Sequence, residues 1–139
     1  MPLYSLTYCS RVADPAMVSV ADILATSRMN NGTRSITGAL MFDNRCFLQV
    51  LEGGHTALTE LFVRIAQDRR HEEVTLLSMV PVMARRFPGW EMHYISRLEA
   101  DQRMIEAFST QGRFNPFAMS PATVEALIDR QAKMAATAA

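Results

Sequence analysis

The chain has 139 residues, 49% of them hydrophobic, and this length and composition suit one domain with a single core that needs no metal or disulfide to fold. Its formal net charge of zero argues against non-specific binding to nucleic acid and against a role at a membrane surface. No apolar run is long enough to span a bilayer, and no basic region precedes an apolar stretch at the start of the chain, so we expect no membrane segment and a cytoplasmic location.

The first two predicted elements are a strand and a helix. Residues 3–10 alternate in a way that favours a strand, with Tyr8 on its apolar side. Residues 17–30 place apolar side chains three and four positions apart, which is the pattern of a helix with one apolar face. Asn30–Gly32 then predicts the end of that helix, because Asn and Gly tolerate the left-handed conformation found at helix C-termini.

The same patterns predict five further elements, which are strands over 36–42 and 46–51, a helix over 56–68, and strands over 74–80 and 90–96. The order strand, helix, strand, strand, helix, strand matches the split β-α-β arrangement of ferredoxin-like folds. We therefore predict an α+β sandwich, in which a mixed five-stranded sheet carries both helices on one face.

The second face of the sheet also needs a cover. Leu48 and Val50 point away from the face that carries Gln49, and both are apolar. The candidates are C-terminal helices, one over 102–108 and one beginning at Ser120–Pro121, where a capping residue precedes proline at the first helical position. This divides the chain into a domain over 1–97 and a helical extension over 98–139 that packs on the sheet.

Gln49 is the most informative single residue. It shares one face of a predicted buried strand with Phe47 and Leu51, and an unpaired buried amide costs roughly 1–3 kcal/mol. In one interpretation, Gln49 bonds a nearby backbone group. In the other, it faces a bound polar ring.

Four other residues join Gln49 in a combination that bears on this choice. Tyr8 lies on the first strand, Asn31 at the end of the first helix, and Trp90 and Met92 on one predicted face of the fifth strand. Each has an ordinary structural explanation, as a core aromatic, a helix cap or a core side chain. Together they predict polar groups inside an apolar pocket, which is the usual character of a cofactor site.

Other chemistry is not indicated. The sequence has no glycine-rich phosphate loop and no nucleophile elbow, and its three histidines lack metal-ligand spacing. Cys9 and Cys46 are expected to be buried free thiols. The pair Arg85–Arg86 and the run Arg69–His71 are each interpreted, taken alone, as solvated cations, and His93 is expected to face outward.

Five segments occur in a recognisable order: Ser5–Arg11, Asn30–Gly38, Phe47–Gly53, Asp68–His71 and Arg85–Met92. The two most specific read Phe-x-Gln-x-Leu-Glu-Gly and Arg-Phe-x-x-Trp-x-Met. On these segments, residues 2–96 of the chain resemble the BLUF family, whose members sense blue light with FAD.

The resemblance implies a flavin held without a covalent bond between the two sheet-packed helices. FAD is the expected cofactor, and FMN is possible. The cofactor-binding residues that the resemblance implies are Tyr8, Ile23, Asn30, Asn31, Phe47, Gln49, Arg64, Asp68, Arg70 and His71. Asn31 would hold the polar edge of the ring, and the charged residues over 64–71 would lie toward the ribityl and phosphate groups. Asn30 stands where some members carry a histidine that contacts the ring.

The resemblance also implies a light response by four photoactive residues, namely Tyr8, Gln49, Trp90 and Met92. Tyr8 would give an electron and then a proton, Gln49 would change its hydrogen bonds, and strand five would pass the change to the C-terminal helices. We expect no enzymatic activity, and an output through a homo-oligomer or an unidentified downstream protein. Two alternatives are a small ferredoxin-like phosphatase and a cofactor-free interaction domain, and the latter predicts that Gln49 bonds only backbone.

Overall fold

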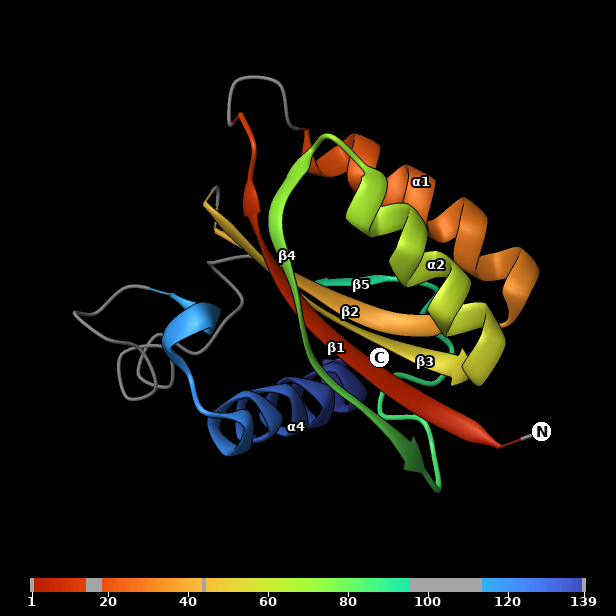
Figure 1. The fold of residues 1–139 in the computed structure, drawn as a ribbon. Coiled ribbons are helices and arrows are strands. Elements are labelled where there is room, and N and C mark those ends of the chain that lie inside the picture. Colours follow the sequence, from red (N-terminus) through yellow and green to blue (C-terminus); the bar gives the residue numbers. More distant parts are fainter. Residues whose placement is uncertain (1, 15–18, 44, 96–113, 139) are drawn as a thin grey trace.

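The computed structural model describes residues 2–14, 19–43, 45–95 and 114–138. A twisted five-stranded sheet lies between two helices on one face and one helix on the other (Figure 1). The elements are β1 (Leu3–Val12), α1 (Val20–Arg34), β2 (Thr37–Phe42), β3 (Cys46–Gly54), α2 (His55–Gln67), β4 (His71–Val82), β5 (His93–Ile95), the 3₁₀ turn η2 (Pro116–Ala118) and α4 (Pro121–Ala138). The predicted α+β ferredoxin-like fold is confirmed.

The strands lie in the order β4-β1-β3-β2-β5. β1 and β3 are central and antiparallel, and their register sets Tyr8 directly opposite Gln49. β5 alone pairs in parallel, through Ala39–Met41 of β2. Within the described part of the chain, no helix is both long and apolar enough to cross a bilayer.

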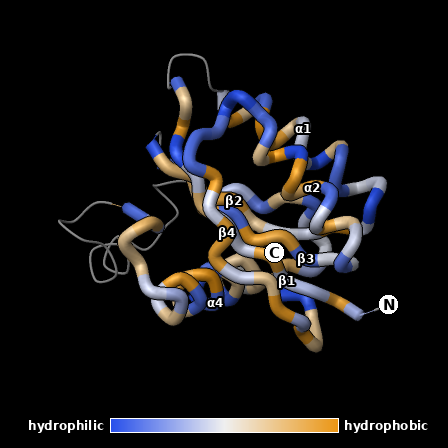
Figure 2. The backbone as a smooth tube through the Cα atoms, in the orientation of Figure 1, coloured by the Kyte–Doolittle hydropathy of each residue, from blue (hydrophilic) through white to orange (hydrophobic). Residues whose placement is uncertain are grey.

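Each face of the sheet has its own core, because side chains of β1 and β3 alternate between the two faces. Leu6, Phe47 and Leu51 pack against α1 and α2. Leu48 and Val50 pack against α4, as the apolar character of the second face predicted. Figure 2 shows hydrophobic stretches along the strands and on α4. The helix predicted at 102–108 lies outside the described residues, whereas the helix predicted from Pro121 is present.

The predicted end of the first helix is wrong. α1 does not stop at Asn30–Gly32 but continues to Arg34. Ser35 takes the left-handed conformation at φ 57° instead, and its N–H donates to the Asn31 carbonyl. The consequence is that Asn31 lies inside the last turns of the helix, with its side chain directed by the helix toward the sheet. At the other end, Ser19 caps α1, and the predicted start at residue 17 lies outside the described residues.

The fifth strand begins at His93, later than predicted, so Trp90 and Met92 precede it, and residue 96 lies outside the described residues. Met92 packs in the core below α1 and α2, whereas Trp90 packs in the core below α4, so the prediction that they share one face is wrong. The two-residue period of a strand does not apply here, because Trp90 donates its N–H to Phe87 in a turn. His93 does not face outward but is half-buried, with its ring centroid 4.2 Å from that of Trp90.

The loop between β4 and β5 is anchored rather than solvated, which corrects the interpretation of Arg85 and Arg86. Arg85 donates to the Glu52 carbonyl over 2.9 Å. The Arg86 guanidinium pairs with Glu125 at 2.8 Å and with Asp129 at 3.0 Å, both on α4. The loop therefore connects the end of β3 to the helix on the second face.

Candidate functional site

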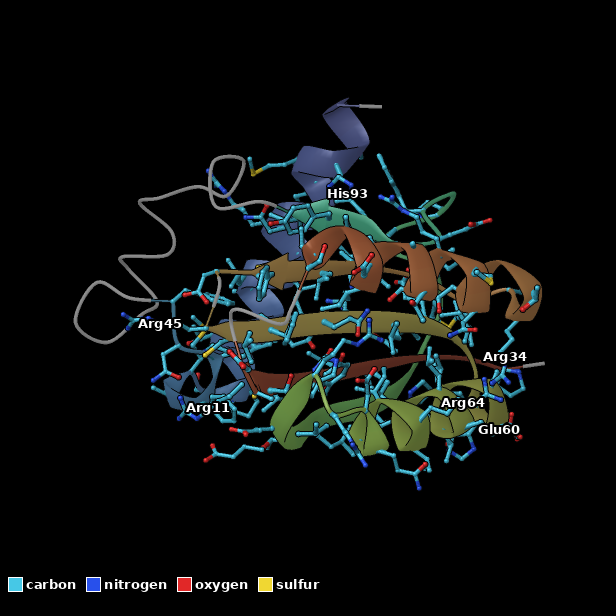
Figure 3. The ribbon with its side chains drawn as sticks, turned by 90° about the horizontal axis from the view of Figure 1, so that it is seen from above. Arg11, Arg34, Arg45, Glu60, Arg64 and His93 are labelled. Atoms are coloured by element: carbon cyan, nitrogen blue, oxygen red, sulfur yellow. The ribbon has the colours of Figure 1, made fainter. Side chains whose placement is uncertain are left out.

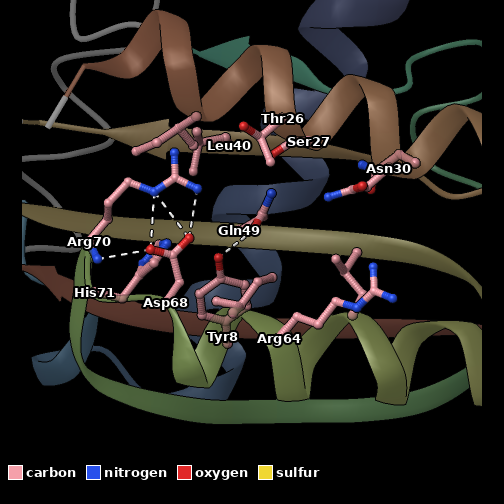
Figure 4. A pocket seen from close by; sticks show the side chains of 14 residues that line it. Tyr8, Thr26, Ser27, Asn30, Leu40, Gln49, Arg64, Asp68, Arg70 and His71 are labelled. Atoms are coloured by element: carbon pink, nitrogen blue, oxygen red, sulfur yellow. Dashed lines mark hydrogen bonds and ion pairs between the residues drawn. The ribbon is translucent and has the colours of Figure 1, made fainter.

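A pocket opens between α1 and α2 above the central strands (Figure 4). Its lining consists of Tyr8, Ile23, Thr26, Ser27, Asn30, Asn31, Leu40, Gln49, Leu61, Arg64, Ile65, Asp68, Arg70 and His71. Nine of the ten residues expected to bind a cofactor are among them, and Phe47 is the exception. Phe47 is fully buried beneath the pocket, where its ring stacks on that of Phe42 at 4.7 Å.

Thr26 and Ser27 line the pocket although neither was predicted. The signal was present in the helical spacing, because Ile23, Thr26 or Ser27, and Asn30 recur every three or four residues. Such spacing places Ile23 and these polar side chains on the face of α1 that lines the pocket.

A buried chain of contacts runs through the centre of the pocket floor. The Tyr8 hydroxyl donates to Gln49 Oε1, and Gln49 Nε2 lies 3.4 Å from the Met92 sulfur. Both polar side chains are buried, with Tyr8 1% and Gln49 3% exposed. These bonds go to side chains, which contradicts the expectation from a cofactor-free domain that Gln49 bonds only backbone.

The electrostatic setting keeps the Tyr8 phenol protonated. Burial raises the pKa of Tyr8 far above its usual value, and the nearby Asp68 carboxylate raises it further. Tyr8 is therefore a neutral hydrogen-bond donor at physiological pH. Among the described residues, the only acceptor of the Gln49 amide nitrogen is a thioether, which is a weak acceptor, so this nitrogen remains available for a stronger one.

Asn31 carries the clearest sign of a missing partner. Its side chain is fully buried, and Nδ2 donates to the Glu91 carbonyl over 2.7 Å. Its Oδ1 is buried among the lining residues and has no hydrogen-bond donor within the described part of the chain. An unpaired buried acceptor costs about 1–3 kcal/mol. The pocket therefore suits a ligand with an N–H group at this position, as an isoalloxazine ring has.

Charged side chains flank the pocket. Arg70 bonds Asp68 over 2.6 Å, and this bond lowers the pKa of the Asp68 carboxyl. Figure 4 shows Arg70 and Arg64 at opposite ends of the opening. Asp68, Arg70 and His71 are half-buried, so the segment is not the fully solvated helix end that its sequence alone suggests. Cationic groups at the mouth suit an anionic ligand group outside the pocket.

The enclosed volume of the pocket is about 80 Å³. Ligand pockets commonly enclose about 300–1,000 Å³. The polar groups thus match a flavin, while the volume requires side chains such as Arg70 to turn or α1 and α2 to separate as the ring enters.

His71 begins β4 beside the pocket. Its Nδ1 lies 2.8 Å from the Ser10 hydroxyl, and its ring centroid lies 4.6 Å from that of Phe47. Burial lowers the pKa of His71 from 6.5 to about 4, against the opposing effect of Asp68. The imidazole is therefore neutral at pH 7.

This lowered pKa predicts a pH-dependent stability. Between pH 6.5 and pH 4 the unfolded chain binds the His71 proton and the folded chain does not, so the free energy of unfolding falls as the pH falls through this window. The loss is at most about 3 kcal/mol. Urea unfolding of the wild type and of His71→Asn at pH 7 and pH 4.5 measures it. Equal losses in the two proteins would contradict the assignment to His71.

Residues 3–93 match the family described as BLUF, sensors of blue-light using FAD. The beta subunit of photoactivated adenylate cyclase from Euglena gracilis is 39% identical over 108 residues, which cover 76% of this chain and 12% of that protein. The alpha subunit is 36% identical over 84 residues, covering 60% and 8%. The chain thus spans only about a tenth of the length of these relatives.

Solved structures show the same similarity. BlrB, a BLUF protein in its dark state, is 35% identical with a TM-score of 0.77, and the match covers 96% of this chain and 97% of that one. BlrP1 from Klebsiella pneumoniae, solved with FMN and cyclic diGMP, is 35% identical with a TM-score of 0.63, covering 68% and 26%. The ground state of BlsA, at 23% identity and a TM-score of 0.84 over 94% of this chain and 87% of that one, supports the fold alone.

Proposed function

This chain belongs to the BLUF family and is a blue-light photoreceptor that uses flavin, and we propose that its flavin is FAD, bound between α1 and α2. Light would act through the Tyr8–Gln49 hydrogen bond. The observation that carries the proposal is the buried Tyr8–Gln49–Met92 chain beneath a pocket in which Asn31 Oδ1 has no donor from any described residue. Asn31 and Gln49 would hold the ring edge, and Arg64 and Arg70 would lie toward the phosphates.

The chain's own residues supply the switch. When bound, the flavin contributes a ring that absorbs blue light and accepts an electron and a proton. Tyr8 is the donor of both, since its phenol is buried, protonated and bonded to Gln49. The Gln49 amide has a donor end and an acceptor end, so its rotation or tautomerisation changes which atom faces Tyr8.

The output begins at Met92. A rotated Gln49 amide no longer places Nε2 against the Met92 sulfur, and the segment before β5 loses that contact. Each changed hydrogen bond is worth about 0.5–1.5 kcal/mol, so the switch can bias the position of Met92 by a few kcal/mol at most. β5 and α4 would pass this bias to a second copy of the chain or to a separate protein. We assign sensing to 1–97 and output to 98–139, with no catalysis by the sensor.

An absorption spectrum tests the proposal. The purified protein should be yellow, its visible bands should shift to the red under blue light, and the shift should decay in the dark. Chromatography of the released cofactor separates FAD from FMN. Failure to take up flavin, or a flavin-loaded protein without a reversible shift, would overturn the proposed function.

A further inference from the structure

We propose that Arg28 and Asn31 are positioning residues that hold the backbone of Glu91 and Met92, and thereby set where Met92 lies against Gln49. We call these two side chains and the two carbonyl groups they bond the α1 latch. The proposal rests on the proposed light response, and it adds a second connection between the pocket and β5 beside the one through Gln49.

Direct contacts define the α1 latch. Asn31 Nδ2 donates to the Glu91 carbonyl over 2.7 Å. Arg28 Nε and Nη2 lie 3.4 Å and 3.3 Å from the Met92 carbonyl oxygen, so the guanidinium forks around one acceptor. Because Arg28 and Asn31 are three residues apart on α1, they project from the same side of the helix. Two successive carbonyl groups are therefore bonded by one helix.

Close packing at the same place supports the α1 latch. A Cβ atom added at Gly32 would lie 3.0 Å from Oε1 of Glu91, so the Glu91 carboxylate lies over Gly32 of α1. On the other side, the Gly38 N–H of β2 donates to the Trp90 carbonyl over 3.1 Å. Residues 90–92 precede the short ladder of β5, and these contacts from α1 and β2 fix their backbone.

The Asn31 amide has its two ends in different places. Its nitrogen bonds Glu91, while its buried oxygen lies at the pocket with no donor. An amide group is planar and turns as one unit, so a change in what Oδ1 accepts alters the direction of the N–H toward Glu91. The α1 latch therefore connects the polar edge of the pocket to the segment that carries Met92.

Trp90 provides a local readout, because it is the only tryptophan in the chain. Arg28→Met keeps most of the apolar stem of the side chain and removes both donors. The variant should keep bound flavin and a full red shift, since Arg28 does not line the pocket. Its Trp90 emission in the dark should differ from wild type. Its dark recovery should be at least threefold slower, because the α1 latch favours the dark position of Met92.

Matched variants separate this role from general effects of the helix surface. Arg28→Lys restores a cationic donor and should return both readouts toward wild type. Arg34→Met makes the same change on the same helix, where the arginine pairs with Glu60 of α2 at 3.4 Å, and it should leave both readouts at wild-type values. Figure 3 shows Arg34, Glu60 and Arg64 at one end of the helix pair.

Asn31→Asp keeps an acceptor and removes the N–H to Glu91, so it should also displace Trp90 emission. Asn30→Asp is the control, because it places the same negative charge in the same pocket. Its Trp90 emission gives the effect of the added charge alone. Two results together would overturn the α1 latch. In the first, Arg28→Met has the Trp90 emission and the dark recovery of the wild type. In the second, Asn31→Asp has the same Trp90 emission as Asn30→Asp. A wild type without any red shift would instead overturn the proposed function.

Discussion

Gln49→Leu should abolish the light-induced red shift while flavin remains bound. Leucine is apolar and suits the row of Phe47 and Leu51, so the strand keeps its packing. The substitution removes the acceptor of the Tyr8 hydroxyl and the donor that would reach the ring. With no amide present, no exchange of hydrogen bonds can follow excitation. The difference spectrum between dark and illuminated protein measures the loss.

Gln131→Leu is the matched control for this prediction. Gln131 is also a buried glutamine, 2% exposed, and its Nε2 has no partner among the residues that the structure describes, but it lies on α4 against the opposite face of the sheet. The same substitution there should leave the red shift intact. Tyr8→Phe, which removes only the hydroxyl, should abolish the photocycle as Gln49→Leu does. A normal shift in Gln49→Leu would show that the amide is not the switch.

Glu52→Ala should lower the free energy of unfolding by roughly 4 kcal/mol. The side chain is fully buried at the end of β3. Its carboxylate accepts from the backbone N–H groups of Arg86 at 2.6 Å and Phe87 at 3.0 Å, and from the Thr37 hydroxyl at 3.1 Å. Alanine leaves two backbone donors without their acceptor, and each unpaired buried group costs about 1–3 kcal/mol. Urea unfolding followed by far-ultraviolet circular dichroism gives the value.

Glu60→Ala is the comparison for Glu52→Ala. The Glu60 carboxylate pairs with Arg34, but its side chain is 58% exposed. An exposed ion pair contributes about 0–1 kcal/mol, so this variant should remain close to wild type. Equal losses for the two glutamates would show that the bonds of Glu52 to the β4–β5 loop do not hold the fold together.

Alternation and helical spacing were sufficient to predict the fold, because the apolar residues of β1, β3 and α2 recur with the period of a strand or of a helix. Tyr8 and Gln49 were both predicted as site residues, and strand register places them directly opposite one another. Prediction failed where tertiary contacts override local pattern. Residues 90–92 look like a strand but have an irregular, bent backbone, and Trp90 and Met92 pack in different cores.

Two further failures have the same origin. Asn30–Gly32 has the composition of a helix end, yet α1 continues because Ser35 takes the left-handed conformation and closes the helix on Asn31. Arg86 looks like a solvated loop cation, yet its partners lie 39 and 43 residues away on α4. Sequence patterns are read over short stretches of neighbouring residues, which do not include partners this far away. The pairing of Asn31 with Glu91 across 60 residues is beyond sequence patterns in the same way.

The short ladder of β5 bears on how much free energy is needed to release this strand from the sheet. In the described residues, three parallel pairs attach this edge strand to β2, whereas β1 and β3 share nine antiparallel pairs. Segments with few ladder bonds open locally at a free energy far below that of global unfolding. Opening β5 at the edge of the sheet therefore costs less free energy than opening the central strands β1 and β3. The hydrogen-bond change that we propose at Gln49 is of the size that could open β5 locally. Amide protons of β5 should therefore exchange with solvent before those of β1 and β3.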